Sequence, residues 1–210
     1  ALTGMTTLVT GGAQHTRLRA DEAFDVARCR ESELDELLTF WAEYGSRRAM
    51  VPVYTREDFG PEGLLAGVAP EDIVRVRRDG QIVACVAMWD QRPKRQFRID
   101  RYRGLLRTAG PIVNAGLAML RLPPLPRAGE PMNLRQIAMT GWSDLNAFEA
   151  GLKCLLAGVD DPRATVAVTK ANDDALWGVF DRLRGVRQKS TLYRVGLGQA
   201  ARRAIPTAEL

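Results

Sequence analysis

Few residues in this chain of 210 could carry nucleophilic, redox or metal chemistry. His15 is the only histidine, which excludes a mechanism that needs two histidines and a metal site built from several. Cys29, Cys85 and Cys154 are odd in number and far apart, which argues against a disulfide framework and a Cys-x-x-Cys metal site. We therefore predict no bound metal and reduced cysteines, with Cys85 and Cys154 in apolar patterns typical of buried thiols.

Glycines near the start of the chain have the form of a phosphate-binding turn, but their spacing does not support one. Residues 8–13, Leu-Val-Thr-Gly-Gly-Ala, look like the strand and turn that open a short-chain dehydrogenase. Such a turn needs further glycines so that the backbone can approach a pyrophosphate. The residues from Gln14 to Arg17 stand in those positions, and we reject the match.

The positive charge of the chain could also serve binding. The net charge is +5, and only four of the 30 basic residues are lysines, at positions 94, 153, 170 and 189. Between positions 94 and 107, basic side chains alternate in part with Phe97, Ile99 and Tyr102, as on a strand with one charged face. That face could bind a phosphate or an acidic partner, or be the solvated edge of a sheet. Because no recognition motif accompanies the charge, a nucleic-acid-binding domain is a minor alternative.

No segment approaches the roughly 20 consecutive apolar residues that a bilayer-spanning helix needs. The best candidate, residues 109–120, is shorter, contains Asn114 and is flanked by Arg107 and Arg121. The start of the chain has no signal-peptide pattern. The apolar fraction of 46% and the charged fraction of 26% are those of a soluble globular protein, and we predict a cytoplasmic one without membrane contact.

The elements that must position any site are clearest in the second half of the chain. The predicted order is strand, helix, strand, helix, strand, over residues 134–140, 145–157, 164–170, 173–184 and 190–197. Ser143 or Asp144 can cap the first of these helices. Strands that alternate with helices of this length predict an α/β (α+β) fold, in which a mixed, partly parallel, twisted sheet has helices on both faces.

In the first half, one helix and one hairpin have strong local signals. Ser32 begins a capping-box-like start, the apolar residues up to Tyr44 follow helical spacing, and Gly45 suits the C-terminal cap. Asp79-Gly80 separates two β-rich runs and predicts a tight hairpin. The strands expected in this half cover residues 5–9, 21–28, 73–77 and 81–89.

Residues 93–131 form a long insertion after the hairpin. Gly110-Pro111 could open a short apolar helix to Leu120, and the Pro-rich segment 122–126 can form neither a helix nor an inner strand. An insertion of this length is typical of a lid or an interface element. We predict an arm over one end of the sheet that contacts another protein unit.

This element order resembles that of the GNAT acetyltransferase superfamily, and most of all the C-terminal half of bacterial proteins that carry two GNAT-like units in tandem. Local strings that share in the resemblance are Arg78-Asp-Gly-Gln-Ile-Val-Ala-Cys85, Met88-Trp-Asp-Gln-Arg92 and the helix start Asn172-x-x-Ala175. The resemblance implies a GNAT-like domain over residues 20–197, a C-terminal tail over 198–210, and a segment over 1–13 that is a tail or a strand of an upstream unit.

In GNAT proteins acyl-CoA lies in a splay between the fourth and fifth strands. A loop of the form R/Q-x-x-G-x-G/A then presents amides and a helix N-terminus to the pyrophosphate. The matching segment here has one glycine, a bulky Trp142, and an Asp144 that would repel phosphates or cap the helix itself. The resemblance thus implies acetyl-CoA as the cofactor, with a degenerate phosphate loop. The residues that it places against the cofactor are Ile137, Ala138, Met139, Gly141, Ser143 and Asn172.

The catalytic residues of the family are largely missing. GNAT enzymes often place a tyrosine on the last helix to protonate the leaving thiolate, and the matching place here is near Phe180. Tyr193 on the final strand could substitute as the general acid, or it could be a half-buried packing residue. Glu130 and Asp90 are nominal bases for an acceptor amine, unless they are surface carboxylates.

Two functions of different classes follow from this resemblance. The first is an enzyme that transfers an acetyl group from acetyl-CoA to an amine on a small molecule or another acceptor. The second is a non-catalytic GNAT-like module that packs on a catalytic unit or binds a small ligand. In either case we expect a second GNAT-like unit or a homo-oligomer as the partner.

Overall fold

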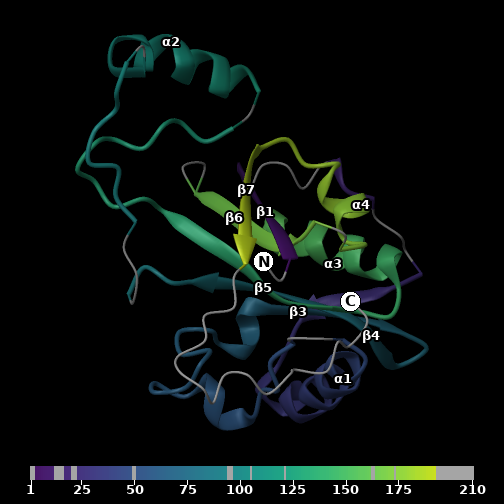
Figure 1. The fold of residues 1–210 in the computed structure, drawn as a ribbon. Coiled ribbons are helices and arrows are strands. Elements are labelled where there is room, and N and C mark those ends of the chain that lie inside the picture. Colours follow the sequence, from purple (N-terminus) through teal and green to yellow (C-terminus); the bar gives the residue numbers. More distant parts are fainter. Residues whose placement is uncertain are drawn as a thin grey trace.

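The fold is built on one mixed sheet. The computed structural model describes residues 3–11, 17–19, 23–48, 51–93, 97–104, 106–120, 122–161, 164–172 and 174–192. The strands are β1 (Thr3–Gly11), β2 (Asp25–Arg28), β3 (Ile73–Arg78), β4 (Gln81–Asp90), β5 (Leu134–Trp142), β6 (Thr165–Ala171) and β7 (Val186–Leu192). They lie in the order β2-β3-β4-β5-β6-β1-β7 (Figure 1). Every neighbouring pair is antiparallel except β5–β6, which is parallel. The predicted mixed, partly parallel sheet is therefore confirmed.

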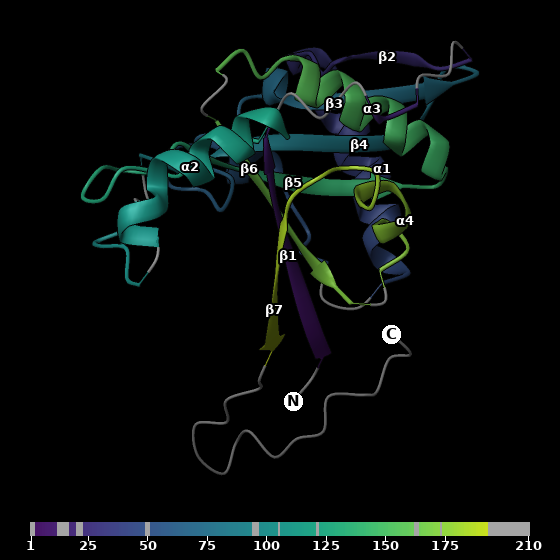
Figure 2. The same ribbon diagram turned by 90° about the horizontal axis from the view of Figure 1, so that it is seen from above.

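Helices cover both faces of this sheet, as predicted. Those of the described residues are α1 (Leu34–Ser46), α2 (Leu106–Met119), α3 (Leu145–Ala157) and α4 (Trp177–Phe180). α1 packs on one face, and α3 and α4 lie on the other (Figure 1). α2 stands away from the sheet (Figures 1 and 2).

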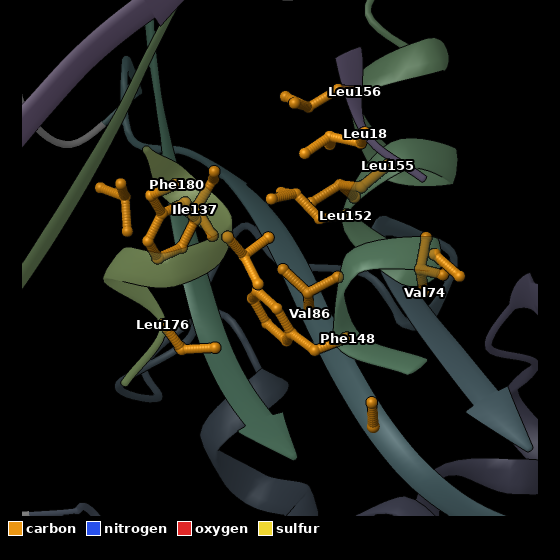
Figure 3. Close-up of a cluster of buried hydrophobic side chains, with 14 of the residues drawn as sticks. Leu18, Val74, Val86, Ile137, Phe148, Leu152, Leu155, Leu156, Leu176 and Phe180 are labelled. Carbon is orange, nitrogen blue, oxygen red and sulfur yellow. The ribbon is translucent and has the colours of Figure 1, made fainter. Parts of the chain in front are cut away.

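The two faces have separate apolar cores because side chains alternate along each strand. β4 sends Val86 into the core under α3 and α4, and it sends Cys85 and Ala87 into the core under α1. Phe148 of α3 and Phe180 of α4 meet edge to face at 5.9 Å between ring centroids, in the core that Figure 3 shows. Burying a side chain of this size stabilises the fold by about 1.5–3 kcal/mol.

The local start of α1 differs from the prediction. A 3-10 turn, Glu31–Glu33, precedes the helix, and the carboxylate of Glu33 accepts a hydrogen bond from the Arg30 amide at 2.9 Å. Glu33 also pairs with Arg75 of β3, with 3.2 Å between Nε and Oε1. Ser32 is therefore not the capping residue. The sequence pattern could not indicate the role of Glu33, because the cation that anchors its carboxylate lies on a distant strand.

The hairpin and α3 form where they were predicted. Asp79 and Gly80 have φ values of 51° and 80°, as the tight turn between β3 and β4 requires. α3 has the predicted bounds, and Asp144, one of the two predicted candidates, caps it. Gly45 lies inside the last turn of α1 rather than beyond its end.

The C-terminal elements depart from the prediction. The helix expected over residues 173–184 is regular only over α4, where Gly178 lowers the helix propensity. β7 begins at Val186, not at residue 190, and pairs with β1 at the edge of the sheet. Because its side chains up to Thr191 are exposed, no apolar alternation marks it in the sequence. Tyr193 and the later part of the predicted strand lie outside the described residues.

β1 lies inside the sheet, between β6 and β7. It pairs with β6 from Met5 to Gly11 and with β7 from Thr3 to Val9. Leu8 of β1 is buried in the core under α3 and α4. The first strand of the chain is therefore a structural part of this sheet.

The insertion projects from the sheet as an arm, defined here as residues 97–131, that ends in α2 (Figures 1 and 2). The helix begins at Leu106 and runs through Pro111, so the prediction of a start at Gly110-Pro111 was wrong. Pro111 lies in the second turn, where it removes only one helical hydrogen bond. α2 has no buried residue, and its Ile112 is 77% exposed. Among the described residues, no helix has the length and apolar character to cross a membrane.

Candidate functional site between strands β5 and β6

β5 and β6 are paired over only part of their length. Their parallel register joins residues 134–136 of β5 to residues 165–167 of β6. In the described structure, β5 continues to Trp142 and β6 to Ala171 without pairing further with each other. The two strands diverge towards their C-terminal ends (Figure 2). Backbone groups on one side of β5 beyond Gln136 are thus not paired with β6.

A bulge in β5 lies beside this splay. Met139 and Thr140 face a single position of β4, because the register of the β4–β5 pair shifts between Cys85 and Ala87. Met139 has a φ of 47°, a left-handed conformation that is rare for a residue other than glycine. Strained bulges of this kind occur next to binding sites, where they redirect backbone groups.

Most of the predicted cofactor residues line up along this stretch, namely Ile137, Ala138, Met139, Gly141 and Ser143. Ile137 belongs to the core under α3 (Figure 3), and Met139 belongs to the core under α1. Gly141 lies so close to α1 that a Cβ there would be 3.2 Å from the ring of Phe40. Their contribution to a ligand site would therefore come from the backbone, while their side chains fix the strand.

Asn172, the remaining predicted cofactor residue, is engaged with β1. Its side-chain oxygen accepts a hydrogen bond from Oγ1 of Thr6 at 2.7 Å. Its backbone amide donates to the carbonyl of Gly4 at 3.0 Å, and a Cβ on Gly4 would collide with the Asn172 side chain. The structure thus does not bring Asn172 together with the residues of β5.

Lys170 of β6 crosses the splay, and the sequence analysis missed it. Its Nζ donates a hydrogen bond to Oγ1 of Thr140, and Oδ2 of Asp174 lies 3.9 Å from the same nitrogen. Burial lowers the pKa of Lys170, and Arg48 lowers it further, whereas Asp174 opposes both. A lysine within an apolar, β-branched run was the signal that could have identified it.

The N-terminus of α3 is occupied by the chain's own carboxylate. Oδ1 of Asp144 accepts hydrogen bonds from the amides of Asn146 and Ala147, at 2.8 and 3.2 Å. Its other oxygen, Oδ2, forms an ion pair with Arg78 at 2.8 Å. Asp144 therefore satisfies amides that would otherwise be available to an anion.

A pocket of about 290 Å³ opens between α1 and the loop after β5. Arg48 stacks over the rings of Tyr44 and Trp142, with its guanidinium carbon 4.0 and 4.7 Å from their centroids. Burial raises the pKa of Tyr44 to about 12, so its hydroxyl stays protonated at neutral pH. The pocket thus combines an aromatic wall with a guanidinium, which suits a planar or anionic group.

The two carboxylates considered as bases form ion pairs with arginines away from the splay. Phe180, at the place matched to the family's catalytic tyrosine, is buried in the core under α3 and α4. Asp90 pairs with Arg92, whose hydrogen bonds hold the pKa of that carboxyl below its usual value. Glu130 is an exposed residue of the arm and pairs with Arg127 at 3.6 Å. The structure therefore does not bring these carboxylates to the splay.

The cysteines are free thiols, as the sequence predicted. Cys29 and Cys85 are buried and Cys154 is half-buried. Burial raises the pKa of Cys29 to about 11 and that of Cys85 to about 12, so neither is a thiolate at neutral pH. Within the described residues, no group of three or more His, Cys, Asp or Glu side chains could hold a metal ion.

Comparisons with known proteins concern the fold. No family model matches the chain, and no curated protein matches it in sequence. A functionally unknown conserved protein from Staphylococcus epidermidis ATCC 12228 is similar in structure, with a TM-score of 0.52 and 10% identity. The alignment covers 89% of this chain and 59% of that protein.

Two other solved structures have lower scores. One is a putative acetyltransferase from the GNAT family from Novosphingobium aromaticivorans DSM 12444, with a TM-score of 0.43, 10% identity and coverage of 89% of this chain and 62% of that one. The other is a GCN5-related glucosamine N-acetyltransferase region in a fungal multi-domain GH3 β-N-acetylglucosaminidase, with a TM-score of 0.47, 11% identity and coverage of 89% and 20%.

The fold is GNAT-like. The mixed sheet of seven strands has its parallel pair at the centre, and that pair opens into a splay beside a bulge. This chain spans about 59% and 62% of the length of the first two structural neighbours. At such identities the likeness concerns the fold and not the activity.

Proposed function

We propose that this domain binds acyl-CoA in the splay between β5 and β6 and transfers its acyl group to an amine. The observation that carries the proposal is the splay together with the Met139 bulge. Beyond Gln136, β5 has backbone groups that β6 does not pair, and these can bond the amides of a pantetheine arm. When bound, the thioester supplies an activated acyl group.

The residues of the chain fit the parts of this cofactor unequally. The bulged backbone at Met139 and Thr140 would hold the thioester end. At the phosphate end, Gly141 is the single glycine of the loop, and Asp144 already occupies the amides of α3. We therefore expect most of the affinity to come from the pantetheine arm. Tyr193 remains the proposed general acid.

A second candidate function is a non-catalytic module. The observations that favour it are the Asp144 cap at the phosphate position and the Lys170 side chain across the splay. A domain with both features could keep the fold as a support for a catalytic partner or bind a smaller ligand.

Calorimetric titration tests the main proposal. We expect acetyl-CoA to bind with a dissociation constant weaker than the low micromolar range, which corresponds to less than about 8 kcal/mol. S-acetylpantetheine, which lacks the phosphates, is the matched control. It should bind within about threefold of acetyl-CoA, a difference well below the roughly 1.4 kcal/mol of a tenfold change, because the phosphates are expected to add little affinity. Tight binding of acetyl-CoA alone would show that the phosphate loop works. No binding of either compound would favour the non-catalytic module.

The expected partner is likewise a proposal. We expect a second GNAT-like unit or a second copy of this chain to pack on the arm. The exposed helix α2 of the arm, which has no buried residue, supports this expectation.

A further inference from the structure

Lys170 brings a primary amine into the splay. Its Nζ bonds to the hydroxyl of Thr140, the residue that follows the Met139 bulge. The Lys170 side chain is 20% exposed, so most of it is enclosed while part of it stays accessible. An amine thus contacts the part of β5 where the proposed function places the thioester.

The surroundings favour the neutral form of this amine. Burial and Arg48, at the end of α1, lower the pKa of Lys170, and a neutral amine is the nucleophilic form. Asp174, on the segment after β6, is the carboxylate that faces the amine, at 3.9 Å. It can accept a proton, and its own side chain is 23% exposed, which allows the proton to be passed on.

We propose that Lys170 is a self-acylation site, an acyl acceptor within the chain itself that takes the acyl group of acyl-CoA bound in the splay. The inference rests on the proposed function of that splay. The lone pair of the neutral Nζ forms a bond to the thioester carbonyl carbon as the C–S bond breaks. Coenzyme A leaves as a thiolate with the bonding electrons. The proton lost by the nitrogen passes through Asp174 to that thiolate, so the products are an Nε-acyl-lysine and free coenzyme A.

Acylation would change the cleft that performs it. It replaces the ionisable amine that faces Asp174 by a neutral amide, and it adds an acyl group to a side chain that already spans the splay. The modified chain should therefore bind acyl-CoA more weakly than the unmodified chain. Such a reaction stops after one turnover and needs no separate acceptor pocket.

The test is quantitative mapping of acetylation on the full chain incubated with acetyl-CoA. Lys153 and Lys189, two of the chain's four lysines, serve as internal controls in the same sample. We expect Lys170 to be acetylated at least about tenfold faster than either control, since a held amine gains effective concentration. Lys170→Arg should lose this modification, and Lys189→Arg should keep it. Thermal unfolding of both variants checks that they fold.

Two further measurements separate self-acylation in the splay from chemical acetylation that needs no coenzyme A site. Acetyl phosphate acetylates lysines without a coenzyme A site, and an equal preference for Lys170 with this reagent would overturn the role of the cleft. Calorimetry with coenzyme A on the unmodified chain tests the splay directly. Binding without acetylation at Lys170 overturns the self-acylation alone, whereas the absence of both overturns it together with the proposed function. Binding, Lys170 acetylation and its loss in Lys170→Arg together are the result we expect.

Discussion

At the scale of single residues, Arg75 shows how a buried charge fixes this fold. It is 8% exposed on β3, and its guanidinium bonds Asp25 at 2.7 Å and Glu33 at 3.2 Å. A buried cation that loses a partner is costly, because nothing else replaces its hydration. Glu33 thus joins the start of α1 to the sheet, besides capping its own turn through the Arg30 amide.

We predict that Glu33→Gln destabilises the fold by about 1.5–3 kcal/mol at neutral pH, the range for hydrogen bonds to charged groups. Burial raises the pKa of Glu33, but the Arg30 amide and the cations Arg75 and Arg77 outweigh it, so the folded pKa lies below the ordinary 4.5. Its contribution is therefore present above pH 4.5 and is lost as the pH falls through the folded pKa.

Urea unfolding at about pH 7 and about pH 3 measures this dependence. The gap between wild type and Glu33→Gln should shrink in acid. The exposed Glu62→Gln is the control and should match the wild type at both pH values. An unchanged gap in acid would contradict the role of the Glu33 charge.

Asp144 offers a second prediction at this scale. Asp144→Ser keeps a residue that can cap α3 and removes the negative charge at the phosphate position. Stability should change by less than about 1 kcal/mol, since serine is among the preferred N-caps. Acetyl-CoA should bind about threefold to tenfold more tightly, because one like charge is removed beside the phosphates. Calorimetry compares this variant with Asp144→Ala, which also loses the cap. Unchanged affinity in both variants would place the phosphates elsewhere.

At the scale of elements, the β3–β4 hairpin depends on its turn. Gly80 has a φ of 80° with open space around the position of a Cβ, so Gly80→Ala tests backbone strain without a clash. We predict a loss of about 1 kcal/mol. Gly178→Ala is the matched control, because Gly178 is helical and also has open space. It should be neutral or stabilising by up to about 1 kcal/mol. Equal effects of the two substitutions in thermal unfolding would refute the turn argument.

At the scale of the whole molecule, the arm is the part whose helix does not pack into either apolar core. α2 has no buried residue, and within the arm the Tyr102 hydroxyl donates to the Pro126 carbonyl at 2.6 Å. We predict that replacing residues 107–127 by a short flexible linker leaves cooperative unfolding intact. It should weaken self-association or binding to a partner unit, measured by analytical ultracentrifugation. Global unfolding would instead place the arm in the core, and unchanged association would remove it as the interface.

The sequence determined the elements whose signals are local. Asp79-Gly80 predicts its hairpin because a tight turn needs positive φ at both positions. The apolar spacing of α3 predicts its bounds because one face of the helix is buried against the sheet. Alternating strands and helices then predict a mixed sheet of GNAT-like order, because parallel neighbours need a crossover between them.

Only the tertiary structure decided features that depend on residues far apart in the chain. β7 is an exposed edge strand, so no apolar pattern in its sequence fixes where it begins. The cap at Glu33 depends on Arg75, which lies 42 positions away in the chain. Lys170 bridges the splay only because β6 is no longer paired with β5 after Ala167 and the amine then reaches Thr140. Such juxtapositions arise from packing, and no local pattern in the sequence shows which residues will meet.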